Sequence, residues 1–214
     1  GHHHQLPRQR GGPLAAGGPI TMAGKVDSQL GGKRAELYVM GELLKRGAVP
    51  YLPLVDVEGV DAYIRTSSGK LVAIQIKSSG SAGSPSPRWF EMRAITPGKD
   101  FFIIGVECPN GMPEHAWVFP STVFDKYAPP RKSGTCGLNL DTGAKKYGMP
   151  LRDLLCGFRN RWELITNYDK YAALLESPED LEDFLTMKEA TEAPREEGLT
   201  LEEYERRQAA DIPG

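Results

Sequence analysis

Residues 60–80, VDAYIRTSSGKLVAIQIKSSG, constrain the fold more than any other stretch of the chain. Residues 60–66 alternate apolar and polar side chains, which is typical of a strand with one buried face. The next four residues, Ser-Ser-Gly-Lys, favour a tight turn, and residues 71–77 are nearly all apolar, as in a central strand. The stretch therefore predicts a hairpin whose second strand is buried. Because side chains alternate along a strand, Gln75 and Lys77 share one face, and the buried strand is expected to end in a polar site.

The elements around this hairpin predict a mixed α/β domain, with an N-terminal helix packed on a central mixed β-sheet and extra C-terminal helices. The first helix is expected over residues 29–46, with Ser28 as its N-cap and Gly47 as its stop. Residues 48–54 contain two prolines and predict an edge strand. Further strands are expected at 89–93, 101–107, 116–119 and 137–140, and further helices at 121–127, within 151–167 and at 178–190.

The chain is expected to have three parts. Residues 1–21 contain three of the four histidines among Gly, Pro and Ala, and are interpreted as an expression tag and linker. Residues 22–175 form the predicted main domain and carry 20 basic and 15 acidic residues, an excess that suits a polyanionic partner. Residues 176–214 carry 13 acidic and 4 basic residues and predict an acidic tail, helical or disordered. A solubilising tail on an ordinary domain is the simpler explanation of this charge distribution.

Several kinds of site are excluded by residues that the sequence lacks. His115 is the only histidine outside residues 1–21, so a cluster of histidine metal ligands is not available. Cys108, Cys136 and Cys156 are widely spaced and odd in number, which argues against a disulfide framework or a zinc site and favours the cytoplasm. No glycine-rich phosphate loop occurs, so no nucleotide cofactor is expected. No apolar run is long enough to predict a membrane span.

Polar side chains at unusual positions occur on three of the predicted elements. With about 100° per residue, Glu36 lies inside an apolar stripe of the first helix, formed by Leu37, Val39, Met40, Leu43 and Leu44. Asp61 lies on the first hairpin strand, with Asp56 as a nearby rival, and Gln75 and Lys77 lie on the second. Each position alone is explained by a salt bridge, a strand edge or a snorkelling lysine. Because an unpaired buried carboxylate is costly, the three together favour one shared cleft.

These residues resemble the conserved pattern of the PD-(D/E)xK nuclease superfamily. The matching positions are Glu36 in GGKRAELYVMGELLKRG, Asp61 in VEGVDAYIR, and Gln75 with Lys77 in LVAIQIKSS. The Q-x-K variant is similar to the archaeal-resolvase-like, Mrr-like and intron-endonuclease-like branches. The resemblance covers about residues 28–77, and it implies a restriction-endonuclease-like core.

The resemblance implies a metal-dependent phosphodiesterase, a DNA endonuclease, although the residues do not separate DNA from RNA. Glu36, Asp61 and Gln75 would hold Mg²⁺ or Mn²⁺, and Lys77 would lie at the attacked phosphate. Cleavage of a duplex needs two sites, so a homodimer or higher homo-oligomer is expected. Contacts to nucleic-acid phosphates are expected from Lys33, Arg34, Arg88, Arg131, Lys132, Lys145 and Lys146.

The alternative is a nuclease-like fold that binds nucleic acid, or serves in assembly, without catalysis. Gln75 favours this alternative, because its amide offers a neutral oxygen where related nucleases place a charged carboxylate.

Overall fold

The computed structural model describes residues 22–192 except Asp56, Glu58, Pro129 and residues 81–87, 142–144 and 147–148. The side chains of residues 22–28, 145–149, 187 and 189–192 also lie outside the description. The predicted tag and most of the predicted acidic tail are therefore outside the described residues. Within the part that is described, every helix is too short or too polar to cross a bilayer.

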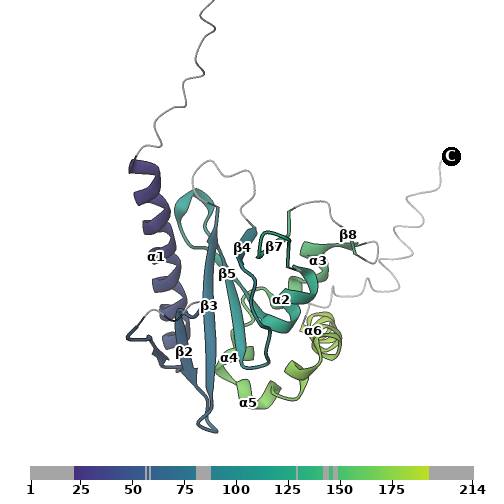
Figure 1. Ribbon diagram of the computed structural model, residues 1–214. Coiled ribbons are helices and arrows are strands. Elements are labelled where there is room, and N and C mark those ends of the chain that lie inside the picture. Colours follow the sequence, from purple (N-terminus) through teal and green to yellow (C-terminus); the bar gives the residue numbers. More distant parts are fainter. Residues whose placement is uncertain are drawn as a thin grey trace, which may run out of the picture.

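A five-stranded mixed sheet forms the centre of the protein, in the order β1-β2-β3-β5-β6 (Figure 1). Its strands are β1 (Pro50–Tyr51), β2 (Ala62–Arg65), β3 (Leu71–Ser79), β5 (Phe101–Glu107) and β6 (His115–Pro120). The hairpin of β2 and β3 is antiparallel, with Ala62 opposite Ile74, whereas β3 and β5 run parallel from the pair Ala73 and Phe101 onward. The predicted mixed α/β class is thus confirmed, and β1 lies at the sheet edge as the prolines predict.

Helix α1 (Met22–Lys45) covers one side of this sheet (Figure 1). Ala35, Val39 and Leu43 are fully buried and recur every four residues, so they form the stripe that faces the sheet. Leu37 and Leu44 are 66% and 56% exposed, so their predicted place in the buried stripe is wrong. At about 100° per residue, the three buried side chains centre some 60° from Glu36, which puts Glu36 at the margin of the stripe.

The predicted N-cap of this helix is also wrong, because α1 begins at Met22 and Ser28 lies inside it. Residues 22–27 contain no proline, and a single glycine costs only about 1 kcal/mol in a helix. A residue suited to capping therefore marks the start of a helix only where the residues before it disfavour helical structure.

A second, two-stranded sheet lies on the other side of the central sheet (Figure 1). It pairs β4 (Trp89–Arg93) with β7 (Thr135–Asn139) in antiparallel register. The ring of Phe90 lies so close to Gly105 of β5 that a Cβ at Gly105 would be 2.7–2.8 Å from it. Strand β4 therefore crosses the central sheet where β5 has no side chain.

Helices α2 (Ser121–Tyr127), α3 (Leu151–Leu154) and α6 (Pro178–Glu192) lie on this second side of the molecule (Figure 1). The remaining elements are helices α4 (Glu163–Thr166) and α5 (Tyr168–Tyr171), 3-10 turns at Pro109–Gly111, Cys156–Phe158 and Leu174–Glu176, and a small pair of strands, β8 (Lys145–Lys146) and β9 (Met149–Pro150). Helix α6 buries Leu181 and Leu185. Lys126 of α2 reaches Glu179 and Glu182 of α6 at 2.8 and 3.0 Å. The first part of the acidic segment therefore packs on the body of the protein.

Candidate active site

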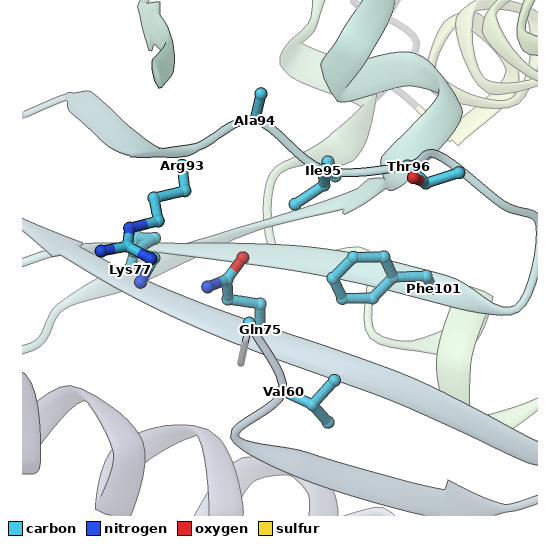
Figure 2. Close-up of a pocket in the computed structure, with 9 residues that line it drawn as sticks. Val60, Gln75, Lys77, Arg93, Ala94, Ile95, Thr96 and Phe101 are labelled. Carbon is cyan, nitrogen blue, oxygen red and sulfur yellow. The ribbon is translucent and has the colours of Figure 1, made fainter. Parts of the chain in front are cut away.

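A cleft of about 790 Å³ opens above the middle of β3 (Figure 2). One wall is the approach to β2, the floor is β3 with the start of β5, and the other wall is the segment that follows β4. The lining residues are Gly59, Val60, Gln75, Lys77, Arg93, Ala94, Ile95, Thr96 and Phe101. Gln75 and Lys77 are both on the floor, because residues two apart on a strand point to the same face.

Gln75 is the most unusual of these side chains. It is only 7% exposed, and its Oε1 has no hydrogen-bond partner among the described residues. Gly59, with a positive φ of 79°, packs beside the amide, so that a Cβ there would be 3.8 Å from Nε2. An unpaired buried polar atom costs about 1–3 kcal/mol. The amide oxygen is therefore an acceptor for a group that enters the cleft.

Asp61 is held against β3 at the level of these two side chains. Its Oδ2 accepts a hydrogen bond of 2.6 Å from the backbone N–H of Ile76, the residue between Gln75 and Lys77. Its own N–H donates to the carbonyl of Ile74 at 2.8 Å. The side chain of Asp61 thus takes the place of a backbone acceptor at the next position of the hairpin. The hydrogen bond from Ile76 involves only Oδ2, and Oδ1 takes no part in it.

Glu36 approaches the site from α1 and is not part of the cleft lining. Its carboxylate, 35% exposed, forms an ion pair with Lys33 one turn earlier. The hydrogen bond and the charge of Glu36 raise the pKa of Lys33, and the charge of Asp61 raises it further. Lys33 is therefore within electrostatic reach of both carboxylates. The structure thus brings Gln75 and Lys77 into one cleft with Asp61 beside them, and places Glu36 next to Lys33.

The sequence-based predictions missed Arg93, which lines the cleft beside Lys77 (Figure 2). Arg93 is the exposed last residue of β4, sixteen positions after Lys77. Alternation in β4 indicates that Phe90 and Met92 face inward and that Arg93 faces away from them, but it does not indicate which strand lies opposite. Ile95, Thr96 and Phe101 were missed for the same reason.

Several side chains predicted to contact phosphates are engaged with protein groups. Arg88 bonds Glu107 at 3.2 Å and Asp141 at 2.7 Å, and these bonds, chiefly the one to Asp141, raise its pKa. Glu107 is buried and also accepts from Trp117 at 2.5 Å. Arg88 therefore fastens the start of β4 to the central sheet, and its charge is compensated.

The remaining basic candidates are spread over the surface. Arg34 donates weakly to the carbonyl of Gly111 at 3.4 Å, and Arg131 pairs with Glu91 at 3.1 Å. Lys132 is exposed. The backbones of Lys145 and Lys146 form β8, but their side chains lie outside the description.

The donor set at the cleft fits a hard divalent cation. The amide oxygen of Gln75 lines the cleft, the carboxylate of Asp61 lies beside it, and Glu36 lies on α1 outside the lining. Carboxylate and amide oxygens are ligands suited to Mg²⁺ or Mn²⁺. No group of three His, Cys, Asp or Glu residues is close enough to hold a metal in the described part of the chain. A metal bound here would therefore depend on the unpaired oxygen of Gln75 as well as on the carboxylates.

The fold and this site define a mixed α/β protein with a cleft of hard oxygen and cationic groups at its central hairpin. No family model matches the chain, and no curated protein matches it. Among solved structures, it is similar to the bacterial homing endonuclease I-Ssp6803I, with 22% sequence identity and a TM-score of 0.47. This match covers 67% of the present chain and 95% of the other.

Proposed function

We propose that the protein is a metal-dependent phosphodiesterase that cleaves nucleic acid, acting as a DNA endonuclease. The observation that carries this proposal is the buried, unpaired Oε1 of Gln75 beside Lys77 in an open cleft. A fold does not leave a buried acceptor unpaired without a cost of about 1–3 kcal/mol. A bound cation would satisfy this acceptor and would also compensate the carboxylate held against Ile76.

In this proposal Glu36, Asp61 and Gln75 hold Mg²⁺ or Mn²⁺. When bound, the cation supplies positive charge against the negative charge that develops on the attacked phosphate. Lys77 orients the attacking water and offsets the charge on the phosphate oxygens. Arg93, which reaches the cleft from β4, contacts a phosphate oxygen and positions the nucleic-acid strand.

Nucleic acid is the proposed partner, with two copies of the protein acting together on a duplex. The exposed Lys132 is a candidate phosphate contact, and Lys33 becomes one if a cation displaces it from Glu36. Arg88 is a weaker candidate, because Glu107 and Asp141 already compensate its charge.

The second candidate is a nucleic-acid-binding module without catalysis. Two observations favour it: Gln75 is neutral, and Glu36 already has a cationic partner in Lys33. In such a protein the amide of Gln75 would accept a hydrogen bond from the bound nucleic acid instead of binding a metal.

The experiment that tests the proposal combines calorimetric titration of Mg²⁺ with plasmid nicking in Mg²⁺ and Mn²⁺. Wild type is expected to bind one metal ion and to nick DNA. Lys77→Ala should abolish nicking with little loss of DNA affinity, because one lysine is a small share of the phosphate contacts. Asp61→Asn keeps an oxygen for the Ile76 N–H but removes the charge, so it should lose both metal binding and nicking.

The control is Met112→Ala, an exposed position whose side chain is not part of the cleft lining. If wild type neither binds metal nor nicks DNA at any salt concentration, while still binding DNA, the catalytic proposal fails in favour of the binding module.

A further inference from the structure

The cleft has two chemically different ends (Figure 2). At one end lie the cationic side chains of Lys77 and Arg93, with Gln75 next to them. At the other end lie Phe101 and Ile95, with the hydroxyl of Thr96 on the rim. Of the groups in the proposed mechanism, those that line the cleft, Gln75, Lys77 and Arg93, all lie at the first end.

The second end extends well beyond a phosphate group. Phe101 lies opposite Ala73 in the parallel pair of β3 and β5, and Ala73 is four residues from Lys77. At about 3.3 Å per residue, the ring therefore begins some 13 Å along the sheet from the backbone of Lys77. Phe101 is only partly buried, so an edge or face of its ring is open to the cleft. The volume of about 790 Å³ falls within the range typical of sites for small organic ligands.

We propose that this cleft receives one unpaired nucleotide, with its phosphate at Lys77 and Arg93 and its base against Phe101 and Ile95. The substrate class is then single-stranded or locally unpaired nucleic acid. This inference rests on the proposed function, because it takes the same cationic end as the place of the attacked phosphate.

The chemistry of a nucleotide matches the order of groups in the cleft. A nucleotide carries its negative charge at one end and a flat aromatic base at the other. In an intact duplex the faces of the bases are stacked on each other, and only their edges and the phosphates reach a protein. An aromatic and aliphatic surface beside a phosphate site can meet the face of a base only after that base has left the stack.

Thr96 offers a way to close the apolar end without touching the cationic end. It is exposed and lies in the segment after β4, outside any helix or strand. Thr96→Trp should fill the recess while leaving the fold intact. The matched control is Met112→Trp, which adds the same ring at an exposed position away from the cleft.

The test measures binding of an oligonucleotide carrying 2-aminopurine, as a single strand and in a blunt duplex of the same sequence, without divalent ions. Wild type should bind the single strand more tightly and change its 2-aminopurine fluorescence. Thr96→Trp should lower single-strand affinity at least tenfold and duplex affinity less than twofold, whereas Met112→Trp should match wild type. Phe101→Leu, which keeps an apolar side chain but removes the ring, should lose most of the fluorescence change.

The outcomes separate this inference from the proposed catalysis. Equal affinity of wild type for both substrates, or a Thr96→Trp protein that binds the single strand like wild type, overturns the unpaired-nucleotide site even if the protein nicks plasmids. Selective loss of single-strand binding in a protein that never nicks DNA supports the nucleotide site and overturns the catalytic role.

Discussion

At the scale of single residues, the ligand role proposed for Gln75 can be tested by changing its charge. Gln75→Glu adds a negative charge at the same volume, and if Gln75 is a metal ligand this should tighten Mg²⁺ binding and keep or raise nicking. Without metal the new carboxylate would be buried near Asp61, so the melting temperature in EDTA should fall. The measurements are Mg²⁺ titration by calorimetry and thermal melts with and without Mg²⁺.

Gln75→Met is the matched control, since it keeps the length of the side chain and removes its oxygen. It should bind Mg²⁺ more weakly than wild type. A Gln75→Glu protein that melts lower in EDTA and gains no stability from Mg²⁺ would contradict a ligand role for this position.

Asp169 gives a residue-scale prediction for pH. It accepts hydrogen bonds from the N–H and Oγ of Ser68, at 2.8 and 2.7 Å, and from Ser67, which ties the hairpin tip to α5. These bonds, led by that of Ser67, lower the pKa of Asp169 to about 2 from an ordinary value of 3.8. Because the folded pKa is depressed, the stabilisation is complete above pH 3.8 and is lost as the pH falls toward 2.

Asp169→Asn should therefore lower the melting temperature at pH 7 and lose this effect near pH 2. Thermal melts of both proteins between pH 2 and 7 check the prediction, with Asp183→Asn, an exposed acid of α6, as the control. A difference between Asp169→Asn and wild type that stays constant over this range would mean that the charge of Asp169 contributes nothing.

At the scale of elements, the site depends on how β4 crosses the central sheet. Gly105 lets the ring of Phe90 lie against β5, and β4 carries Arg93 to the cleft. In Gly105→Ala the added Cβ would meet that ring at 2.7–2.8 Å, so β4 has to shift. We expect a loss of about 1–3 kcal/mol in the free energy of unfolding, typical of overpacking, together with weaker DNA binding.

Urea unfolding and DNA-binding assays measure the two effects. Gly98→Ala is the control, because a Cβ there has no heavy atom within 4 Å, and it should change stability by less than about 0.5 kcal/mol. Should Gly105→Ala unfold like wild type, the crossing of β4 would not depend on this close approach.

At the scale of the whole molecule, the acidic C-terminal segment is expected to have two parts with different roles. Helix α6 is fastened to the body by its buried Leu181 and Leu185 and by the ion pairs of Lys126. Residues 193–214 contain few apolar side chains, chiefly Leu199, Leu201 and Ile212, and are predicted to be dispensable for folding.

A protein that ends at Glu192 should keep the melting temperature of the full chain. A protein that ends at Ser177 should lose more stability than the 2–5 kcal/mol typical of a single buried Leu→Ala change, because it loses two buried leucines. Thermal and urea unfolding of the three lengths decide this. A large drop at Glu192 would show instead that the last residues dock on the body or on a second copy.

Elements with local sequence signals could be predicted before the structure was known. Alternation and turn chemistry predicted the hairpin of β2 and β3 and the shared face of Gln75 and Lys77, because the side-chain period of a strand is fixed by its own backbone. The predicted bounds of β4, β5 and α2 also match the structure, because the signals that set them are local. The placing of Glu36 and Asp61 about one metal ion stays a prediction.

The faces and partners that these elements contact depend on the packing of the folded chain and could not be predicted in this way. The exposure of Leu37 and Leu44 depends on where the sheet lies, which the helix alone does not encode. Arg93 reaches Lys77 because Phe90 packs on Gly105, a contact between residues far apart in the chain. The charge of Arg88 is compensated by Glu107 and Asp141, which are also distant in the sequence. Contacts of this kind depend on the packing of the whole chain, so the local pattern of apolar and polar residues does not predict them.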